Sequence, residues 1–465
     1  MTRRPAGAYR PAEPEGFLTI FARLASRTGE RGDEPTNHRP RLTAGTPGLL
    51  RSINQRSVLE LIRERGPLSR AQVARDTGLS KPTVSLALSS LLADGLVREV
   101  GRSTGGKGPG AVLYQLDPSA GWVVGIDVGR RWVRSAIADI AGEIVARRSE
   151  RARARSARSL IGQIGDVAHH LAAEAGIDWH QVTHATIGSP GVFDPRRGLM
   201  EMAPNLPGWG RQGIVEAVRE HLGTNVTVEN DVNLAALGER ARGHGRTFED
   251  FVYLSVGTGI GIGIVLGGRL YRGARGAAGE IGYLPVGTGD PATRATRRRG
   301  AFEEAAAAEG IVRLAREAGV PGESAEQVFA AARRGDLRAI RAVEAEARLL
   351  ALGIAAIAPV LDPEAVILGG GVGRSGDLLV DRIERELHGL SPFRPRILVS
   401  ELGEEAVLAG AVATSLDEAR HEIFERPAGR AGPARDDGHA PGVTSLVRAI
   451  PTEQQARTAH GGGSR

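Results

Sequence analysis

The stretch FVYLSVGTGIGIGIVLGGRLYRGARGAAGEIGY, from Phe251 to Tyr283, decides the fold. Four of its first five residues are apolar, with aromatic and β-branched side chains among them, and these five residues predict a buried strand. Glycine then recurs at every second position, so one face of the following hairpin carries no side chains at Gly257, Gly259, Gly261 and Gly263. Such a face fits either a phosphate held by backbone N–H groups or a neighbouring element that crosses the strand closely. This stretch alone leaves both interpretations open.

The composition is that of a globular protein, with 465 residues, 41% of them hydrophobic, and room for two or three domains. The absence of cysteine excludes disulfides and thiolate metal ligands. No apolar run reaches the ~18 residues that a membrane span requires, and the first residues lack the apolar segment of a signal peptide. We therefore expect a cytoplasmic protein with no membrane partner.

The net charge of +6 is unevenly distributed, because the excess of Lys and Arg falls within residues 1–120. This asymmetry favours a nucleic-acid partner for the N-terminal part, although an Arg-rich base composition would also produce it. Residues 1–48 and 421–465 are rich in Pro, Gly and Arg without a sustained apolar period. We expect a disordered arm and a disordered tail there.

Residues 49–118 have the pattern of three short helices followed by two strands. The first helix ends before Pro67, the second is capped by Ser69 and closed by Gly78, and the third is capped by Ser80. Two strands, 96–100 and 111–116, flank a glycine-rich loop. From residue 54 to residue 116 this order resembles a winged helix-turn-helix domain.

That resemblance implies DNA binding by the polar N-terminal end of the third helix and by the loop that forms the wing. The residues expected to contact DNA are Ser80, Lys81, Thr83, Ser85, Arg102 and Lys107. A winged helix that binds another protein is the alternative.

Residues 119–420 begin with strand patterns at 123–126, 133–139 and 144–148, followed by a helix pattern and a strand at 183–187. This order resembles the ribonuclease-H-like half of the sugar kinase, heat-shock and actin superfamily. We therefore expect an α/β fold: a two-lobed ribonuclease-H-like domain preceded by an α+β winged helix. The Ala-rich segment 324–359 predicts one long helix.

Six motifs make the resemblance specific, and they occur in the order found in the ROK family of repressors, open reading frames and kinases. They read GSPGVFD (188–194), APNLPGW (203–209), VENDVNLAALGE (228–239), the glycine hairpin, GEIGY (279–283) and VILGGGVG (366–373). Together they cover residues 122 to about 419, and the family includes xylose and N-acetylglucosamine repressors.

The ROK resemblance implies a sugar site made of carboxylate and amide side chains, with glycine where backbone approaches the ring. Its residues are Gly191, Asn205, Asn230, Asp231, Glu280, Tyr283 and Glu303. In the kinases the aspartate at the position of Asp231 also acts as the base toward the attacking hydroxyl, whereas in repressors it holds the sugar. A simpler alternative is that Asn230 and Asp231 only cap the following helix.

The nucleotide side resembles the kinases less closely. The positions of a vestigial nucleotide site are Asp127, Gly129, Gly257, Thr258, Gly259, Gly369 and Gly370. Kinases of the family continue after the first of these glycines with a small Gly-Thr pair, whereas this chain has Arg130 and Arg131. Two long side chains at this turn argue against productive ATP binding.

The zinc site common in the family is altered as well. Its one histidine and three cysteine ligands align with Tyr283, Arg294, Thr296 and Ala301, none of which replaces them in a tetrahedral site. We expect no metal or other cofactor. The Tyr283 hydroxyl remains available to the sugar.

These observations predict a sugar-responsive transcriptional regulator of the repressor type, with operator DNA and a sugar or sugar derivative as partners. The resemblance implies a homodimer or homotetramer. Two alternatives remain: an active ATP-dependent sugar kinase that carries a DNA-binding domain, with Asp231 as its catalytic base, and a sensor domain that only dimerises.

Overall fold

The computed structural model describes residues 47–104, 110–194, 197–201, 206, 208–287 and 293–425. The expected disordered arm and tail fall almost wholly outside these residues. Two boundaries need correction. Residues 47 and 48 belong to the first helix, because Pro47 fits the first turn, where no N–H is needed. The last helix runs to Glu425, five residues into the expected tail. No helix in the described ranges is long and apolar enough to cross a membrane.

The winged helix-turn-helix has the predicted order of elements. It contains α1 (Pro47–Arg65), β1 (Leu68–Ser69), α2 (Arg70–Thr77), α3 (Lys81–Ala93), β2 (Val97–Arg102) and β3 (Val112–Leu116). The three strands form an antiparallel sheet in the order β1-β3-β2, and the two-residue β1 was not expected. Ser69 and Ser80 cap α2 and α3 as predicted, and Gly78 ends α2 in the left-handed conformation.

The first lobe of the following domain is built on a five-stranded sheet in the order β10-β7-β4-β5-β6. Strands β4, β5 and β6 are antiparallel neighbours, and β7 and β10 join them in parallel. Its elements are β4 (Trp122–Val128), β5 (Trp132–Asp139), β6 (Ile144–Arg151), α4 (Ala157–Glu174), β7 (Val182–Ser189), β8 (Val192–Asp194), β9 (Leu199–Glu201), α5 (Ile214–Leu222) and β10 (Asn225–Asn230).

The second lobe repeats this topology, with the order β13-β12-β11-β14-β15. Again three antiparallel strands are extended by two parallel ones. The strands are β11 (Phe251–Val256), β12 (Ile260–Leu266), β13 (Arg269–Leu270), β14 (Ala365–Gly369) and β15 (Arg396–Val399). The predicted two-lobed ribonuclease-H-like fold is thereby confirmed.

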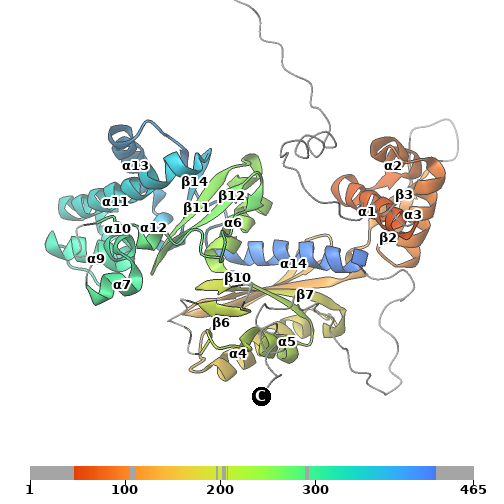
Figure 1. Cartoon of the computed structure of the whole chain (residues 1–465), viewed down its shortest axis with the longest axis horizontal. Coiled ribbons are helices and arrows are strands. Elements are labelled where there is room, and N and C mark those ends of the chain that lie inside the picture. Colours follow the sequence, from red (N-terminus) through yellow and green to blue (C-terminus); the bar gives the residue numbers. More distant parts are fainter. Residues whose placement is uncertain are drawn as a thin grey trace, which may run out of the picture. The chain divides into compact units, whose positions relative to one another are not determined.

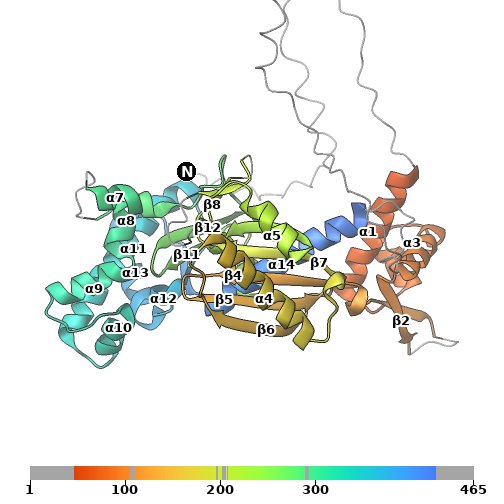
Figure 2. The same ribbon diagram turned by 90° about the horizontal axis from the view of Figure 1, so that it is seen from below.

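Two helices, α6 (Asp231–Arg242) and α14 (Ala406–Glu425), pack against each other and against the sheets. Helix α14 lies on the first sheet, on the face opposite α4 and α5 (Figure 1), and Figure 2 shows α4 across the other face. The two helices cross closely at glycines, since a Cβ on Gly410 would lie 1.8 Å from the Leu234 carbonyl oxygen and one on Gly238 2.1 Å from that of Ala406. The first turn of α6 therefore has a fixed position between the sheets.

The remaining helices belong to the second lobe: α7 (Arg294–Arg299), α8 (Ala301–Ala306), α9 (Ala308–Glu317), α10 (Ala325–Arg333), α11 (Leu337–Leu361), α12 (Gly370–Gly373) and α13 (Gly376–Leu390). The single long helix expected over 324–359 was wrong. Gly335 adopts φ +87° and Asp336 caps a new helix, so the segment forms α10 and α11.

Candidate functional site

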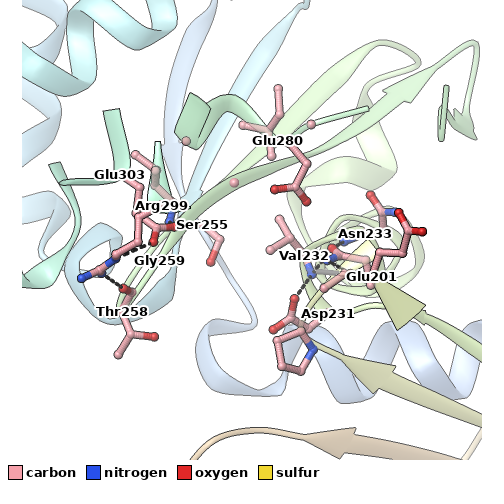
Figure 3. A pocket seen from close by; sticks show the side chains of 18 of the residues that line it. Glu201, Asp231, Val232, Asn233, Ser255, Thr258, Gly259, Glu280, Arg299 and Glu303 are labelled. Atoms are coloured by element: carbon pink, nitrogen blue, oxygen red, sulfur yellow. Dashed lines mark hydrogen bonds and ion pairs between the residues drawn. The ribbon is translucent and has the colours of Figure 1, made fainter. Parts of the chain in front are cut away.

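A cleft of about 1320 Å³ lies beside the glycine hairpin of β11 and β12 and the first turn of α6. It is lined by six of the seven side chains and glycines predicted for the sugar site, namely Gly191, Asn230, Asp231, Glu280, Tyr283 and Glu303. The seventh, Asn205, lies outside the described residues. In Figure 3, Asp231 and Glu280 approach the cleft from different elements, with the Arg299–Glu303 pair on the far side.

Asn230 organises the first turn of α6. Its side-chain oxygen accepts hydrogen bonds from the N–H groups of Val232 (2.9 Å) and Asn233 (3.0 Å), and its amide nitrogen donates to the carbonyl of Gly191 at 2.8 Å. Asn230 therefore caps α6, and it also lines the cleft. The same bonds fix the glycine whose backbone borders the cleft, at φ +105°.

Asp231 follows directly and faces the cleft. One of its carboxylate oxygens accepts the N–H of Val232 at 2.9 Å. Burial, followed by the negative charge of Asp127, raises the pKa of Asp231 to about 7, and the charge of Glu280 acts in the same direction. A carboxylate with this pKa accepts a hydroxyl hydrogen bond strongly, and it has the pKa that a general base needs near neutral pH.

Glu280 reaches the cleft because the preceding residue, Gly279, allows the loop to pack directly against the backbone of β12. Gly279 has φ +101°, a Cβ there would lie 2.0 Å from the Ile262 carbonyl oxygen, and its own carbonyl accepts the Ile262 N–H at 2.9 Å. Burial and the nearby charge of Glu303 raise the pKa of Glu280. The backbone geometry of this tight loop thus places a second carboxylate opposite Asp231.

Glu303 lines the cleft, but its carboxylate is already engaged. One oxygen pairs with the guanidinium of Arg299 at 3.0 Å, and the other accepts the N–H of Ile260 at 3.2 Å. Arg299 also donates to the carbonyl of Thr258 and pairs with Glu309. Glu303 therefore ties α8 to the tip of the glycine hairpin, a role that the sequence pattern did not indicate.

The glycine hairpin crosses a neighbouring element closely, which is one of the two interpretations left open by its sequence. A Cβ on Gly263 would lie 2.6 Å from the Cβ of Ala236 and 2.7 Å from the carbonyl oxygen of Val232, so this end crosses α6 too closely for a side chain. At the other end, Gly257 and Gly259 line the cleft; a Cβ on Gly257 would lie 3.7 Å from the Gly371 nitrogen, and one on Gly259 would lie 2.9 Å from a carboxylate oxygen of Glu303. One half of the hairpin is packed and the other half is open.

The predicted vestigial nucleotide residues only partly gather at the cleft. Gly257, Thr258 and Gly259 line it, whereas Gly369 is packed against the ring of Tyr253 and Gly370 against the backbone of Val256. The N–H of Gly129 donates to the Trp132 carbonyl at 2.9 Å within the β4–β5 turn. The side chain of Arg130, at the tip of that turn, lines the cleft.

Asp127 is buried and paired with Arg134, its cross-strand neighbour, at 3.1 Å. Burial raises the pKa of Asp127, and the guanidinium of Arg134 opposes that rise. Arg134 also pairs with Glu404 at 3.1 Å, and Glu404 pairs with Arg374 at 2.9 Å. Three linked ion pairs therefore connect Asp127, in the first sheet, to Arg374, directly after α12.

The residues at the family's zinc positions do not fit the metal. The Tyr283 hydroxyl donates to the Arg298 carbonyl at 3.0 Å, and the Thr296 hydroxyl donates to Glu304 at 2.5 Å. Thr293 caps α7 and bonds the Thr296 hydroxyl at 2.7 Å. Hydrogen bonds therefore join Tyr283 to α7, and α7 to Glu304 on α8, at the positions that we aligned with the zinc ligands.

Sequence reasoning missed several residues that support the site. Glu229 accepts hydrogen bonds from the Asn230 N–H and from the Asn233 side chain, both at 2.9 Å, and pairs with Arg272 at 2.6 Å. The Glu229 carboxylate is buried and the Arg272 guanidinium is partly exposed, and their pair anchors the segment that leads to Glu280. Glu229 lies near the end of β10, directly before Asn230.

The predicted DNA-contacting residues lie on two parts of the winged helix. Lys81 is exposed at the start of α3 and Ser85 is half-buried one turn on, while the hydroxyls of Ser80 and Thr83 bond each other at 2.7 Å. Arg102, at the end of β2, donates to the Gly110 carbonyl at 3.0 Å across the wing. Lys107 lies outside the described residues.

Comparison with known proteins finds relatives across both parts of the chain. The ROK family profile matches residues 123–418, and a winged helix-turn-helix DNA-binding profile matches residues 51–98. A putative xylose repressor of Caldicellulosiruptor sp. is 27% identical, over 80% of this chain and 98% of its own length. A glucokinase of Halalkalibacterium halodurans is 30% identical, over 62% of this chain and 93% of its own length.

Among solved structures, a ROK family transcriptional regulator, described as a homologue of the E. coli MLC protein, superposes with a TM-score of 0.69. It covers 81% of this chain and 98% of its own at 22% identity, which supports the fold. The profile match spans well over half of the chain, and its motifs form the cleft described above. This chain therefore belongs to the ROK family.

Proposed function

We propose that this protein is a sugar-responsive transcriptional repressor, in which the winged helix binds operator DNA and the cleft binds a sugar or sugar derivative. The observation that carries the proposal is the coexistence of the two sites in one chain. The matches to xylose repressors cover about 80% of this chain, which is more than the ROK domain alone. The match to the glucokinase covers 62%, and the difference is about the length of the winged helix.

The chemistry of the cleft supports a polyhydroxylated ligand. Asp231 and Glu280 present carboxylate oxygens that accept O–H hydrogen bonds, and Gly191 gives a ring access to the backbone. Buried charged acceptors discriminate strongly against ligands that lack a matching hydroxyl, because they would be left unpaired. Asn230 and Glu303 hold the cleft lining in position through their hydrogen bonds, Asn230 with Gly191 and Val232, and Glu303 with Ile260 and Arg299.

Several features argue against phosphotransfer, even though Asp231 has a suitable pKa for a base. Phosphoryl transfer depends on phosphates and magnesium held in position by the protein. Here the Asp127 carboxylate is already in an ion pair with Arg134, and Arg130 lines the cleft beside the glycine hairpin. A base without positioned phosphates contributes little to the rate. We therefore assign the cleft to sensing and Asp231 to sugar binding.

The mechanism that we propose is thermodynamic linkage. A ligand that binds better when the two lobes close around it shifts the protein toward that state. In a homodimer or homotetramer this shift changes the spacing of the winged helices, so that they no longer fit two half-sites one helical turn apart. The oligomeric state is itself a prediction, and light scattering on the purified protein measures it.

The experiment is a thermal-shift screen of the full chain against pentoses, hexoses, amino sugars and their phosphates. We expect a rise in the melting temperature with one sugar class, because a ligand that binds only the folded state stabilises it. The rise should be lost in Glu280→Gln, and an exposed-site control, Glu344→Gln on α11, should keep it. A screen in which no sugar shifts the wild type would contradict the assignment of the cleft.

A further inference from the structure

The outward face of α3 carries an apolar side chain that its fold does not use. Val84, Ala87, Leu88 and Leu91 point into the core of the winged helix and are buried. Leu86 lies on the other side of the helix and is 55% exposed. Pro82 is also exposed and precedes it by one turn, on the same face.

The neighbours of Leu86 on this face are small or flexible. Ser85 and Ser89 lie to one side, and Lys81 is exposed at the N-terminal end of the helix. The hydroxyls of Ser80 and Thr83 are bonded to each other and belong to the helix cap. Leu86 is therefore the largest apolar side chain on this face. Its exposure to water has a free-energy cost that is proportional to the exposed apolar area.

A helix-turn-helix domain inserts this face of its third helix into the DNA major groove. The edges of the base pairs there are hydrogen-bond donors and acceptors, with one apolar exception, the C5-methyl group of thymine. Serine hydroxyls bond to several base edges, and lysine selects guanine or a phosphate, so neither explains an exposed leucine. A thymine methyl group is the apolar partner that the groove offers.

We infer that Leu86 contacts a thymine C5-methyl group and is a specificity-determining residue in operator recognition. The inference rests on the proposed DNA-binding function of the winged helix. Pro82, which lacks an N–H and lies one turn earlier, extends the same apolar strip. Lys81 then supplies affinity at the helix N-terminus, while Leu86 supplies selectivity further along the groove.

The test uses the full-length protein. A binding sequence is first selected from a library of random DNA duplexes, and each thymine in it is then replaced singly by deoxyuridine, which removes only the methyl group. Affinity is measured for the wild type, Leu86→Ala, Leu86→Met and a control, Val145→Ala, whose side chain is exposed on β6. Circular dichroism melting checks that each variant is folded.

The wild type should lose about threefold to tenfold in affinity at one or two thymine positions, the range expected for one or two buried carbon atoms. Leu86→Ala should bind the thymine duplex more weakly by a similar factor and should no longer distinguish thymine from deoxyuridine. Leu86→Met should keep the discrimination, because it restores an apolar contact, and Val145→Ala should behave as the wild type.

Equal affinity of the wild type for every deoxyuridine duplex would overturn the inference, as would full discrimination retained by Leu86→Ala. A Leu86→Ala effect on oligomeric state without an effect on DNA affinity would instead assign the residue to a protein interface. If no duplex sequence is enriched in the selection, the proposed DNA-binding function fails, and the inference fails with it.

Discussion

Arg134 pairs with Asp127 across the β4–β5 hairpin at 3.1 Å, and this ion pair engages the carboxylate that the ROK resemblance assigns to the nucleotide side. Because Arg134 also pairs with Glu404, the carboxylate is bound into a network that includes the loop before α14. We interpret the network as the replacement of a nucleotide site by a structural one.

Phosphotransfer should therefore be absent. With ATP, magnesium and any sugar that binds, turnover should stay far below the usual enzyme range of about 1 to 1,000 per second. The variant with Arg130→Gly, Arg131→Thr and Arg134→Ala should bind magnesium-ATP more tightly than the wild type, as measured by calorimetry. No gain in affinity would contradict the claim that these arginines exclude the nucleotide.

Asp231→Asn should stabilise the ligand-free protein while removing its sugar response. Burial raises the folded-state pKa of Asp231 to about 7, from an ordinary value of 3.8, so its contribution to stability is complete below about pH 4 and is lost as the pH rises toward 7. The gain at pH 7 should be on the order of 1 to 4 kcal/mol and should shrink toward pH 4. Chemical denaturation at several pH values measures it, with the exposed-site variant Asp381→Asn as the control. A destabilised variant at pH 7 would refute the conclusion that burial of the ionised Asp231 carboxylate lowers the stability of the folded protein.

Glu346→Met should also stabilise the protein. Glu346 is fully buried in α11, and among the described residues neither of its carboxylate oxygens has a hydrogen-bond partner. Burial raises its pKa well above the ordinary value, so stability falls as the pH increases above about 4.5. We expect a gain on the order of 1 to 3 kcal/mol at pH 8. The matched control is Glu344→Met, at an exposed position of the same helix, which should change stability little. An equal effect of the two substitutions would contradict this interpretation.

The segment around Thr296 should be held without zinc. Elemental analysis of the purified protein should show far less than one zinc per chain, and a chelator should leave the melting temperature unchanged. Thr296→Val removes the hydroxyl that donates to Glu304, and should cost about 0.5 to 1.5 kcal/mol and speed hydrogen exchange in α7. Stoichiometric zinc, or a melting temperature that falls with chelator, would overturn the alignment of this segment.

The sequence predicted the two lobes and several of the residues that line the cleft, because local rules specify them. The glycine before Glu280 and the helix cap at Asn230 are short-range signals. They determine the local backbone that positions Glu280 and Asp231. The pair between Asp127 and Arg134 was also within reach, since the predicted turn at Gly129 sets the hairpin register that joins them.

Long-range charge pairing was beyond sequence reasoning. The ion pair from Arg134 to Glu404 joins residues that are far apart in the chain, whereas the pair of Arg299 and Glu303 is local, with the i,i+4 spacing that a sequence can indicate. The break between α10 and α11 was missed for a different reason. The Ala-rich pattern continues on both sides of Gly335, and its high helix propensity favoured a single helix. The end of α10 before Gly335 and the N-cap of α11 at Asp336 were therefore missed.

The most direct test of the central claim is the operator affinity of the full-length protein, measured by fluorescence anisotropy with and without the sugar that stabilises it. We expect at least a tenfold change in operator affinity with saturating sugar in the wild type, and no change in Asp231→Asn, which should bind the operator normally without sugar. An unchanged operator affinity of the wild type at saturating sugar would refute the proposed sugar response.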